Sequence, residues 1–160
     1  MILDEKLEFC DATSVALTAG ATVQNIGDIL DTDAARDLGN GEPLYLVITV
    51  DTAIITAGSA GTITFQLVSD STDTIATDGT QTVHFRSKAF VTDDAALNDL
   101  DVGETVVCVA LPYGGDNAAY ERYLALQTYV LTTDTTAGKI NAFLTREPAH
   151  WKAYDSPSQA

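Results

Sequence analysis

Basic residues are scarce in this chain of 160 residues, which has 8 Lys and Arg against 23 Asp and Glu, for a formal net charge of −15. A surface that binds nucleic acid needs clustered Lys and Arg to meet the phosphates. The basic residues here are scattered along the chain instead. The sequence therefore predicts no nucleic-acid partner.

Long hydrophobic runs are also missing. No window approaches 18 consecutive apolar residues, the length that indicates a membrane-spanning helix. The start, from Met1 to Glu5, has no basic stretch followed by an apolar run, so no signal peptide is expected. We expect no membrane partner and synthesis in a bacterial cytoplasm.

Cysteine and histidine are too few for a disulfide framework or a zinc site. Cys10 and Cys108 are the two cysteines, and His84 and His150 are far apart with no cysteine nearby. His84 lies between two apolar residues of an expected strand, so we expect it to face solvent or a partner. The sequence predicts no metal and no cofactor.

Oxygen ligands for calcium are more plentiful. Asp31, Asp33 and Asp37 share one loop, but they miss the EF-hand spacing and its final Glu. The pairs Asp93-Asp94 and Asp99/Asp101 are similar. Aspartates of this kind mostly form turns or solvated surfaces, and a calcium site in such a loop is kept as an open alternative.

Sequence motifs of common enzymes are absent. The segment Gly58-Ser-Ala-Gly61 has the wrong spacing for the strained turn of a serine hydrolase, and no phosphate-binding loop is present. Glycosidases use aromatic side chains to hold sugars, whereas this chain has one Trp. We expect that the protein is not an enzyme.

The residues that are abundant favour strands around a packed core. Thr and Ala are the most frequent types, and Leu, Ile, Val and Phe make up about a quarter of the chain, enough for a hydrophobic core. Strict alternation of apolar and polar residues favours half-buried strands. The expected strands include 44–50, 62–68, 105–111, 123–131 and 139–145, together with a hairpin of 74–77 and 80–85 around Asp78-Gly79.

About eight strands with frequent turn signals predict an all-β fold. We expect an antiparallel β-sandwich, jelly-roll-like or Greek key, with extended terminal arms. Residues 92–101 are ambiguous between a loop and a short helix. The predicted organisation is one domain over residues 1–147, including an N-terminal arm, and an extended tail over 148–160.

The chain ends carry large apolar side chains outside the clearest strands. These are Leu3, Leu7 and Phe9 at one end and Trp151 and Tyr154 at the other. One reading is that they pack on their own domain, and the other is that they reach a neighbouring subunit. Together with Tyr45, they are the candidate residues for an interface with a partner protein or another subunit.

Three stretches of the sequence carry a resemblance. Residues 1–9, 35–51 and 122–130 running into 136–145 together resemble the capsid cement, or decoration, proteins of tailed phages, among them that of the short-tailed Bordetella phage. The resemblance implies a jelly-roll-like β-sandwich that sits as a homo-oligomer outside an HK97-type shell. It also implies that the protein reinforces contacts between major capsid subunits.

We therefore expect a non-enzymatic virion protein on the outer capsid surface, made in the host cytoplasm. The expected partners are the major capsid protein and the protein itself, as a homodimer or homotrimer. The alternative is a carbohydrate- or receptor-binding β-sandwich of a phage or bacterial surface. Clustering of Tyr45, Tyr123 and Tyr129 in one open groove would favour that alternative.

Overall fold

The computed structural model describes residues 5–20, 23–35, 38, 43–56, 61–92, 100–112 and 119–148. Within these residues the chain forms nine strands and one short 3-10 turn, η1 (Glu5–Leu7). The strands are β1 (Glu8–Ser14), β2 (Val23–Asp31), β3 (Tyr45–Thr56), β4 (Thr62–Asp70), β5 (Thr82–Arg86), β6 (Phe90–Val91), β7 (Thr105–Ala110), β8 (Tyr123–Leu131) and β9 (Thr135–Thr145). No helix in this part of the chain is long and apolar enough to cross a membrane.

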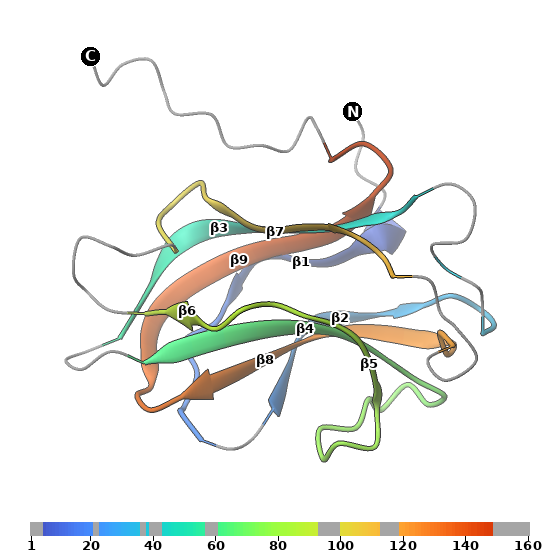
Figure 1. The fold of residues 1–160 in the computed structure, drawn as a ribbon, viewed down its shortest axis with the longest axis horizontal. Helices are drawn as coiled ribbons and strands as arrows, with labels where there is room; N and C mark the ends of the chain where they lie inside the picture. The colour runs from blue at the N-terminus through green and yellow to red at the C-terminus, as the bar shows by residue number, and fades with distance from the viewer. Residues whose placement is uncertain are drawn as a thin grey trace.

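Two antiparallel sheets pack face to face (Figure 1). Sheet A has the strand order β1-β9-β3-β7. Sheet B has the order β2-β8-β4-β5, and the short β6 pairs with β4. The expectation of an all-β sandwich is confirmed.

The pairing follows the jelly-roll pattern. Four antiparallel pairs are nested along the chain, β1 with β9, β2 with β8, β3 with β7, and β4 with β5. This long ribbon wraps on itself, so that β3 also pairs with β9 and β4 with β8. Eight strands in two such sheets are the jelly-roll arrangement, with β6 as an addition.

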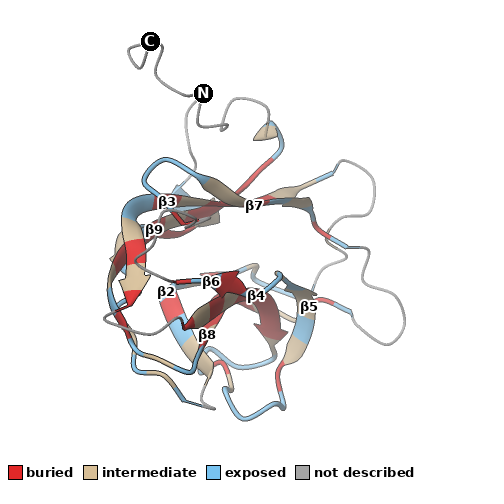
Figure 2. Cartoon of the chain, turned by 60° about the vertical axis from the view of Figure 1, so that its left-hand side comes forward, coloured by how far each residue is buried: buried red, intermediate tan, exposed pale blue. Residues whose placement is uncertain are grey.

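The core lies between the sheets, and the strands of both sheets carry buried segments, drawn red in Figure 2. In β8 the alternation is as expected, because Leu124, Leu126 and Val130 are buried in the core whereas Tyr129 and Leu131 point outward. A strand with a side-chain period of two places one set of residues inside and the other outside. The same rule holds for β4.

Strands β1 and β2 close one side of the sandwich. Gly27 has a φ of +71°, and a side chain there would collide with the backbone carbonyl of Phe9. Glycine tolerates both the positive φ and the close approach. This glycine therefore lets the two edge strands of the sheets come together.

The expected hairpin around Asp78-Gly79 is wrong. Residues 74–77 form no strand, and β5 pairs with β4 across a loop of residues 71–81. The Asp78 carboxylate accepts hydrogen bonds from the backbone N–H and the hydroxyl of Thr80, at 3.1 and 2.7 Å. The two residues form a local turn inside a longer loop.

Most of the ambiguous segment 92–101 lies outside the described residues.

Candidate functional site

The residues expected at an interface separate into three groups. Phe9 is fully buried, with 0% exposure, in the core of its own domain. The expectation that it contacts another subunit is therefore corrected. Leu7 is partly buried against the same core, and Tyr45 is partly exposed on β3. Leu3, Trp151 and Tyr154 lie outside the described residues.

Buried amide side chains form a network on the outer face of sheet B. Gln127 donates to Asn25 Oδ1 and to the carbonyl of Ala76, both at 2.8 Å. Its Oε1 accepts from Gln66 at 2.8 Å and from Gln81 at 3.1 Å. Every polar atom of the Gln127 amide thus has a protein partner, which is how buried polar groups avoid the cost of desolvation.

This network fastens the loop of residues 71–81 over one end of the sheet B face. Ile75, 3% exposed, packs there against Val68 and Ala125. The Asp70 carboxylate also accepts from the N–H of Ala76 at 3.2 Å. The loop, which lies below sheet B in Figure 1, covers this end of the face.

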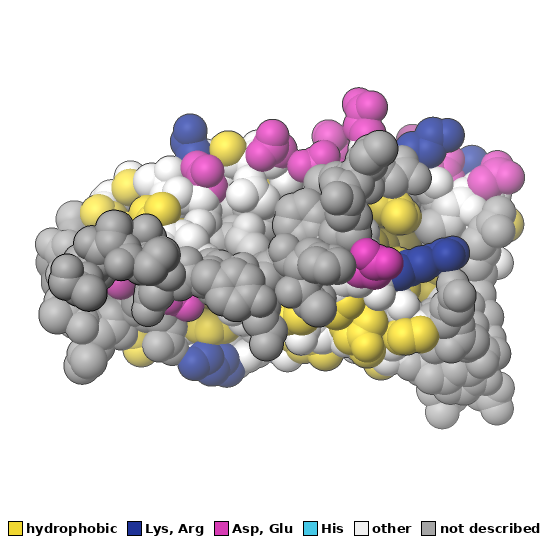
Figure 3. All heavy atoms as spheres, turned by 90° about the horizontal axis from the view of Figure 1, so that it is seen from above, with side chains coloured by type: hydrophobic (Ala, Val, Ile, Leu, Met, Phe, Trp, Pro, Cys, Tyr) yellow, Lys and Arg dark blue, Asp and Glu magenta, His cyan; other side chains and the backbone are white. Residues whose placement is uncertain are grey.

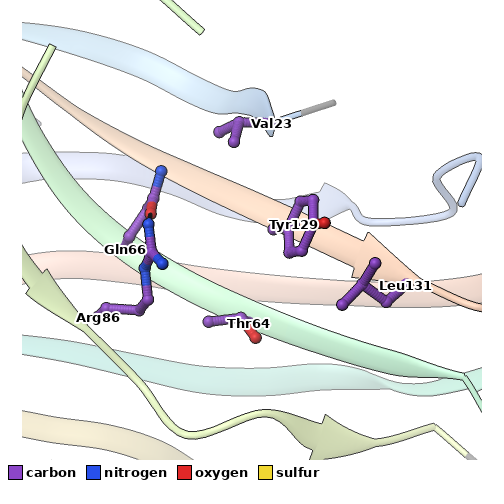
Figure 4. A pocket seen from close by; sticks show the side chains of 6 residues that line it. All are labelled: Val23, Thr64, Gln66, Arg86, Tyr129 and Leu131. Carbon is purple, nitrogen blue, oxygen red and sulfur yellow. Dashed lines mark hydrogen bonds between the residues drawn. The ribbon is translucent and has the colours of Figure 1, made fainter. Parts of the chain in front are cut away.

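At the other end of the same face lies a pocket of about 370 Å³, here called the basin. Strands β2, β8, β4 and β5 each contribute to it. Its position follows from the strand register, because Tyr129 is paired with both Val23 and Thr64, and Gln66 is paired with Arg86. The residues that line it, drawn in Figure 4, are Val23, Thr64, Gln66, Arg86, Tyr129 and Leu131.

Exposed apolar side chains adjoin the basin. Val91 is 48% and Leu131 is 39% exposed. Both are paired with Thr62, so they form one row across β6, β4 and β8 on the outer face. We call this row and the basin together the sheet B surface. Thr62 lies between the two apolar side chains. Exposed apolar groups gathered on one face are typical of a contact site.

The side of sheet A carries charged side chains of both signs. Figure 3 looks onto the molecule from this side, where acidic side chains outnumber the basic ones and basic side chains are visible at several places. The net charge of −15 over the whole chain makes the protein repel polyanions. Strand β7 is the outer strand of sheet A, and a second opening of about 290 Å³ lies between it and the segment around Phe85 and Phe90.

His84 does not face solvent freely, which corrects the expectation. Its ring stacks on Tyr120 at 3.8 Å, and its Nε2 is 2.7 Å from the hydroxyl of Ser69. Burial lowers the pKa of His84 to about 4, because the charged ring would lose hydration. Ser69 is fully buried and also accepts from the N–H of Glu121. The Ser–His contact therefore links the neighbouring strands β4 and β5.

The Asp-rich loop after β2 is tied by an ion pair. Both carboxylate oxygens of Asp31 accept from Arg122, each at 2.7 Å. The hydrogen bond from Arg122 lowers the pKa of Asp31 to about 2. In the part of the chain that the structure describes, no group of three or more His, Cys, Asp or Glu could hold a metal ion. Asp37, Asp93, Asp94 and Asp99 lie outside that part.

The three tyrosines do not line one groove. Tyr45 belongs to sheet A, whereas Tyr129 lines the basin on sheet B. Tyr123 packs against the cluster beneath the 71–81 loop, with the guanidinium of Arg122 at 5.0 Å from its ring. The arrangement lacks the shared aromatic surface that a sugar-binding reading would need.

The residues of the sheet B surface were not found from the sequence. Tyr129 lies on a strand that the sequence predicted, but Val91 and Arg86 lie on short strands whose partners are distant in the chain. Their grouping depends on the pairing of β4 with β5, β6 and β8. Alternation within single strands does not reveal such a register.

Comparison with known proteins finds a family. The model of the family described as Bbp16 matches residues 9–144, which is most of the chain. The match includes all of the described strands except the ends of β1 and β9. A search among curated proteins finds no match.

Proposed function

The chain belongs to the Bbp16 family, whose name points to a protein of a Bordetella phage, and we propose that it is a cement protein of a phage capsid. In this proposal the protein is a non-enzymatic part of the virion. It binds the outer surface of an HK97-type shell and bridges neighbouring subunits of the major capsid protein. Each copy would then oppose the separation of the subunits that it contacts.

The observation that carries the proposal is the sheet B surface. It combines two exposed apolar side chains, Val91 and Leu131, with a basin that is lined by the positively charged Arg86. These groups stand on paired strands, so they are held rigidly and lose little freedom on binding. A stable contact buries about 800 Å² on each partner, so the rest of the contact must come from residues around this surface.

The net charge supports a position outside the shell. Packed DNA is dense in negative charge, and a chain at −15 is repelled by it. On the outer surface the same charge can meet basic patches of the capsid protein, which increases the rate of association.

The alternative function is a module that binds a carbohydrate or receptor. Such modules present several aromatic rings on one surface, and Tyr45, Tyr123 and Tyr129 lie in three separate surroundings here. This arrangement favours the cement function over the alternative.

Self-association as a dimer or trimer is part of the proposal. The outer edge of β7 suits it, because Val106 and Val109 on this edge strand are only partly buried and Cys108 is exposed. An apolar edge strand is prone to pair with another chain. Each copy carries a net charge of −15, and salt screens the repulsion between copies. The dimer or trimer should therefore dissociate less as the salt concentration increases. Light scattering at low and high salt tests this.

Binding to capsid shells tests the proposed function. Purified protein is mixed with shells of the phage that encodes it, from which the native copies have been removed, and the two are sedimented together. The proposal predicts saturable binding and a higher temperature of shell disruption. A protein that stays in the supernatant and leaves the shells unchanged contradicts it.

A further inference from the structure

Arg86 is held in a fixed position at the wall of the basin. Its Nε and Nη2 both donate to Gln66 Oε1, at 3.1 and 2.9 Å. Gln66 is 2% exposed, and its own amide nitrogen donates to Gln127. The guanidinium therefore rests on the buried network, and little side-chain freedom remains to be lost when a ligand binds.

The positive charge of Arg86 has no carboxylate partner among the described residues. Its acceptor is a neutral amide, although the chain has 23 Asp and Glu. Arg122 shows the contrasting arrangement, since its guanidinium is paired with Asp31 on both oxygens. A guanidinium has five N–H donors, so those that do not meet Gln66 are left to bind a ligand.

Other groups of the basin add to this cation. The hydroxyls of Thr64 and Tyr129 line the same pocket, and neither has a hydrogen-bond partner within the described part of the chain. Val23 and Leu131 supply apolar walls, and Figure 4 shows the guanidinium and the Tyr129 ring on the two sides of the pocket. One cation, two hydroxyl donors and an apolar wall match a carboxylate on a short aliphatic stem.

We propose that the basin binds the carboxylate of a Glu or Asp side chain presented by the protein that docks on the sheet B surface. The inference rests on the proposed function and names the chemistry of its partner. Guanidinium and carboxylate form paired, charge-assisted hydrogen bonds, which fix orientation as well as adding affinity. A phosphate-rich partner fits less well, because a single cation meets it on a chain of net charge −15.

The test compares charge variants in the shell-binding assay. Arg86→Gln removes the cation, and Arg86→Lys keeps the charge but not the paired donors. Lys139→Gln is the matched control, because Lys139 is an exposed cation on β9 in the other sheet and its loss changes the net charge equally. We expect Arg86→Gln to weaken binding by about tenfold or more, Arg86→Lys to recover only part of the loss, and Lys139→Gln to bind as the wild type does.

Thermal unfolding of each variant checks that the fold is kept. If Arg86→Gln is unfolded, the double variant Thr64→Val and Tyr129→Phe replaces it, and weaker binding by several-fold is then expected. If the wild-type protein and these variants bind shells equally well, the inference is overturned and the proposed function stands. Wild-type protein that does not bind overturns both.

A small-molecule arm distinguishes an acidic sugar from a protein side chain. Glucuronate is titrated into wild-type protein and Arg86→Gln and followed by NMR. If glucuronate binding depends on Arg86 and shell binding does not depend on Arg86, the assignment to a protein side chain is overturned.

Discussion

At the scale of single residues, three glutamines on the outer face of sheet B, Gln66, Gln81 and Gln127, are buried and hydrogen-bonded to one another. The alternation in β8 places Gln127 on the outer face, and the structure confirms that face. Its 0% exposure follows from the 71–81 loop, which packs over it through the Ala76 carbonyl and Gln81. Period-two patterns report the face of a strand, but they do not report what covers that face.

Gln127→Leu should destabilise the fold by about 2–4 kcal/mol, because the amides of Gln66, Gln81 and Asn25 would lose a buried partner. Urea unfolding at pH 7 measures the loss. The matched control is Gln24→Leu on the edge strand β2, where Gln24 makes one long contact of 3.4 Å with Thr18, and a change under about 1 kcal/mol is expected. Equal losses in the two variants would contradict the structural role of the network.

His84 should make stability depend on pH. Its pKa is about 4 in the folded protein, below the ordinary value of 6.5, so the unfolded chain binds the proton more readily. The free energy of unfolding is therefore retained above pH 6.5 and falls as the pH is lowered toward 4. His84→Gln should show a smaller fall in urea unfolding between pH 7 and 4.5. An identical fall in both proteins would show that His84 is not the source of the pH dependence.

At the scale of elements, the sequence predicted strands better than connections. Residues 62–68 and 123–131 show their alternation locally, and both became strands with the expected inward faces. The Asp78-Gly79 pair is also a local signal, but the path of its loop is decided by contacts of Ile75 with distant Val68 and Ala125. The sheet B surface was missed for the same reason, since it depends on pairing between distant strands.

Gly27→Ala should be more destabilising than Gly79→Ala. Both glycines have a positive φ, but a side chain at Gly27 meets the Phe9 carbonyl, whereas nothing lies within 4 Å at Gly79. Strain at a positive φ costs about 1 kcal/mol in both variants. Gly79→Ala is therefore the control, and the difference between the two variants reports the close approach of β1 and β2. We expect a loss of roughly 3 kcal/mol for Gly27→Ala in chemical unfolding. Equal losses would mean that β1 and β2 separate easily.

At the scale of the whole molecule, the predicted division at residue 147 can be tested by truncation. The family match ends at residue 144 and β9 ends at Thr145, so the sandwich is complete before the tail. Removing residues 148–160 should leave the circular dichroism spectrum and the thermal midpoint nearly unchanged. If Trp151 and Tyr154 contact the shell, occupancy on shells falls, because buried Trp and Tyr contribute strongly to interfaces. Unchanged affinity would show that the tail takes no part in binding.

A cryo-EM map of the particle tests the proposal that this jelly roll is a cement protein outside a phage capsid. We expect density for the four-stranded sheet A and the five-stranded sheet B on the outer surface of the shell, spanning neighbouring capsid subunits. We also expect that the sheet B surface, with Val91, Leu131 and Arg86, faces a subunit. A map with the sandwich inside the shell, in the tail, or missing from the particle would contradict the proposed function.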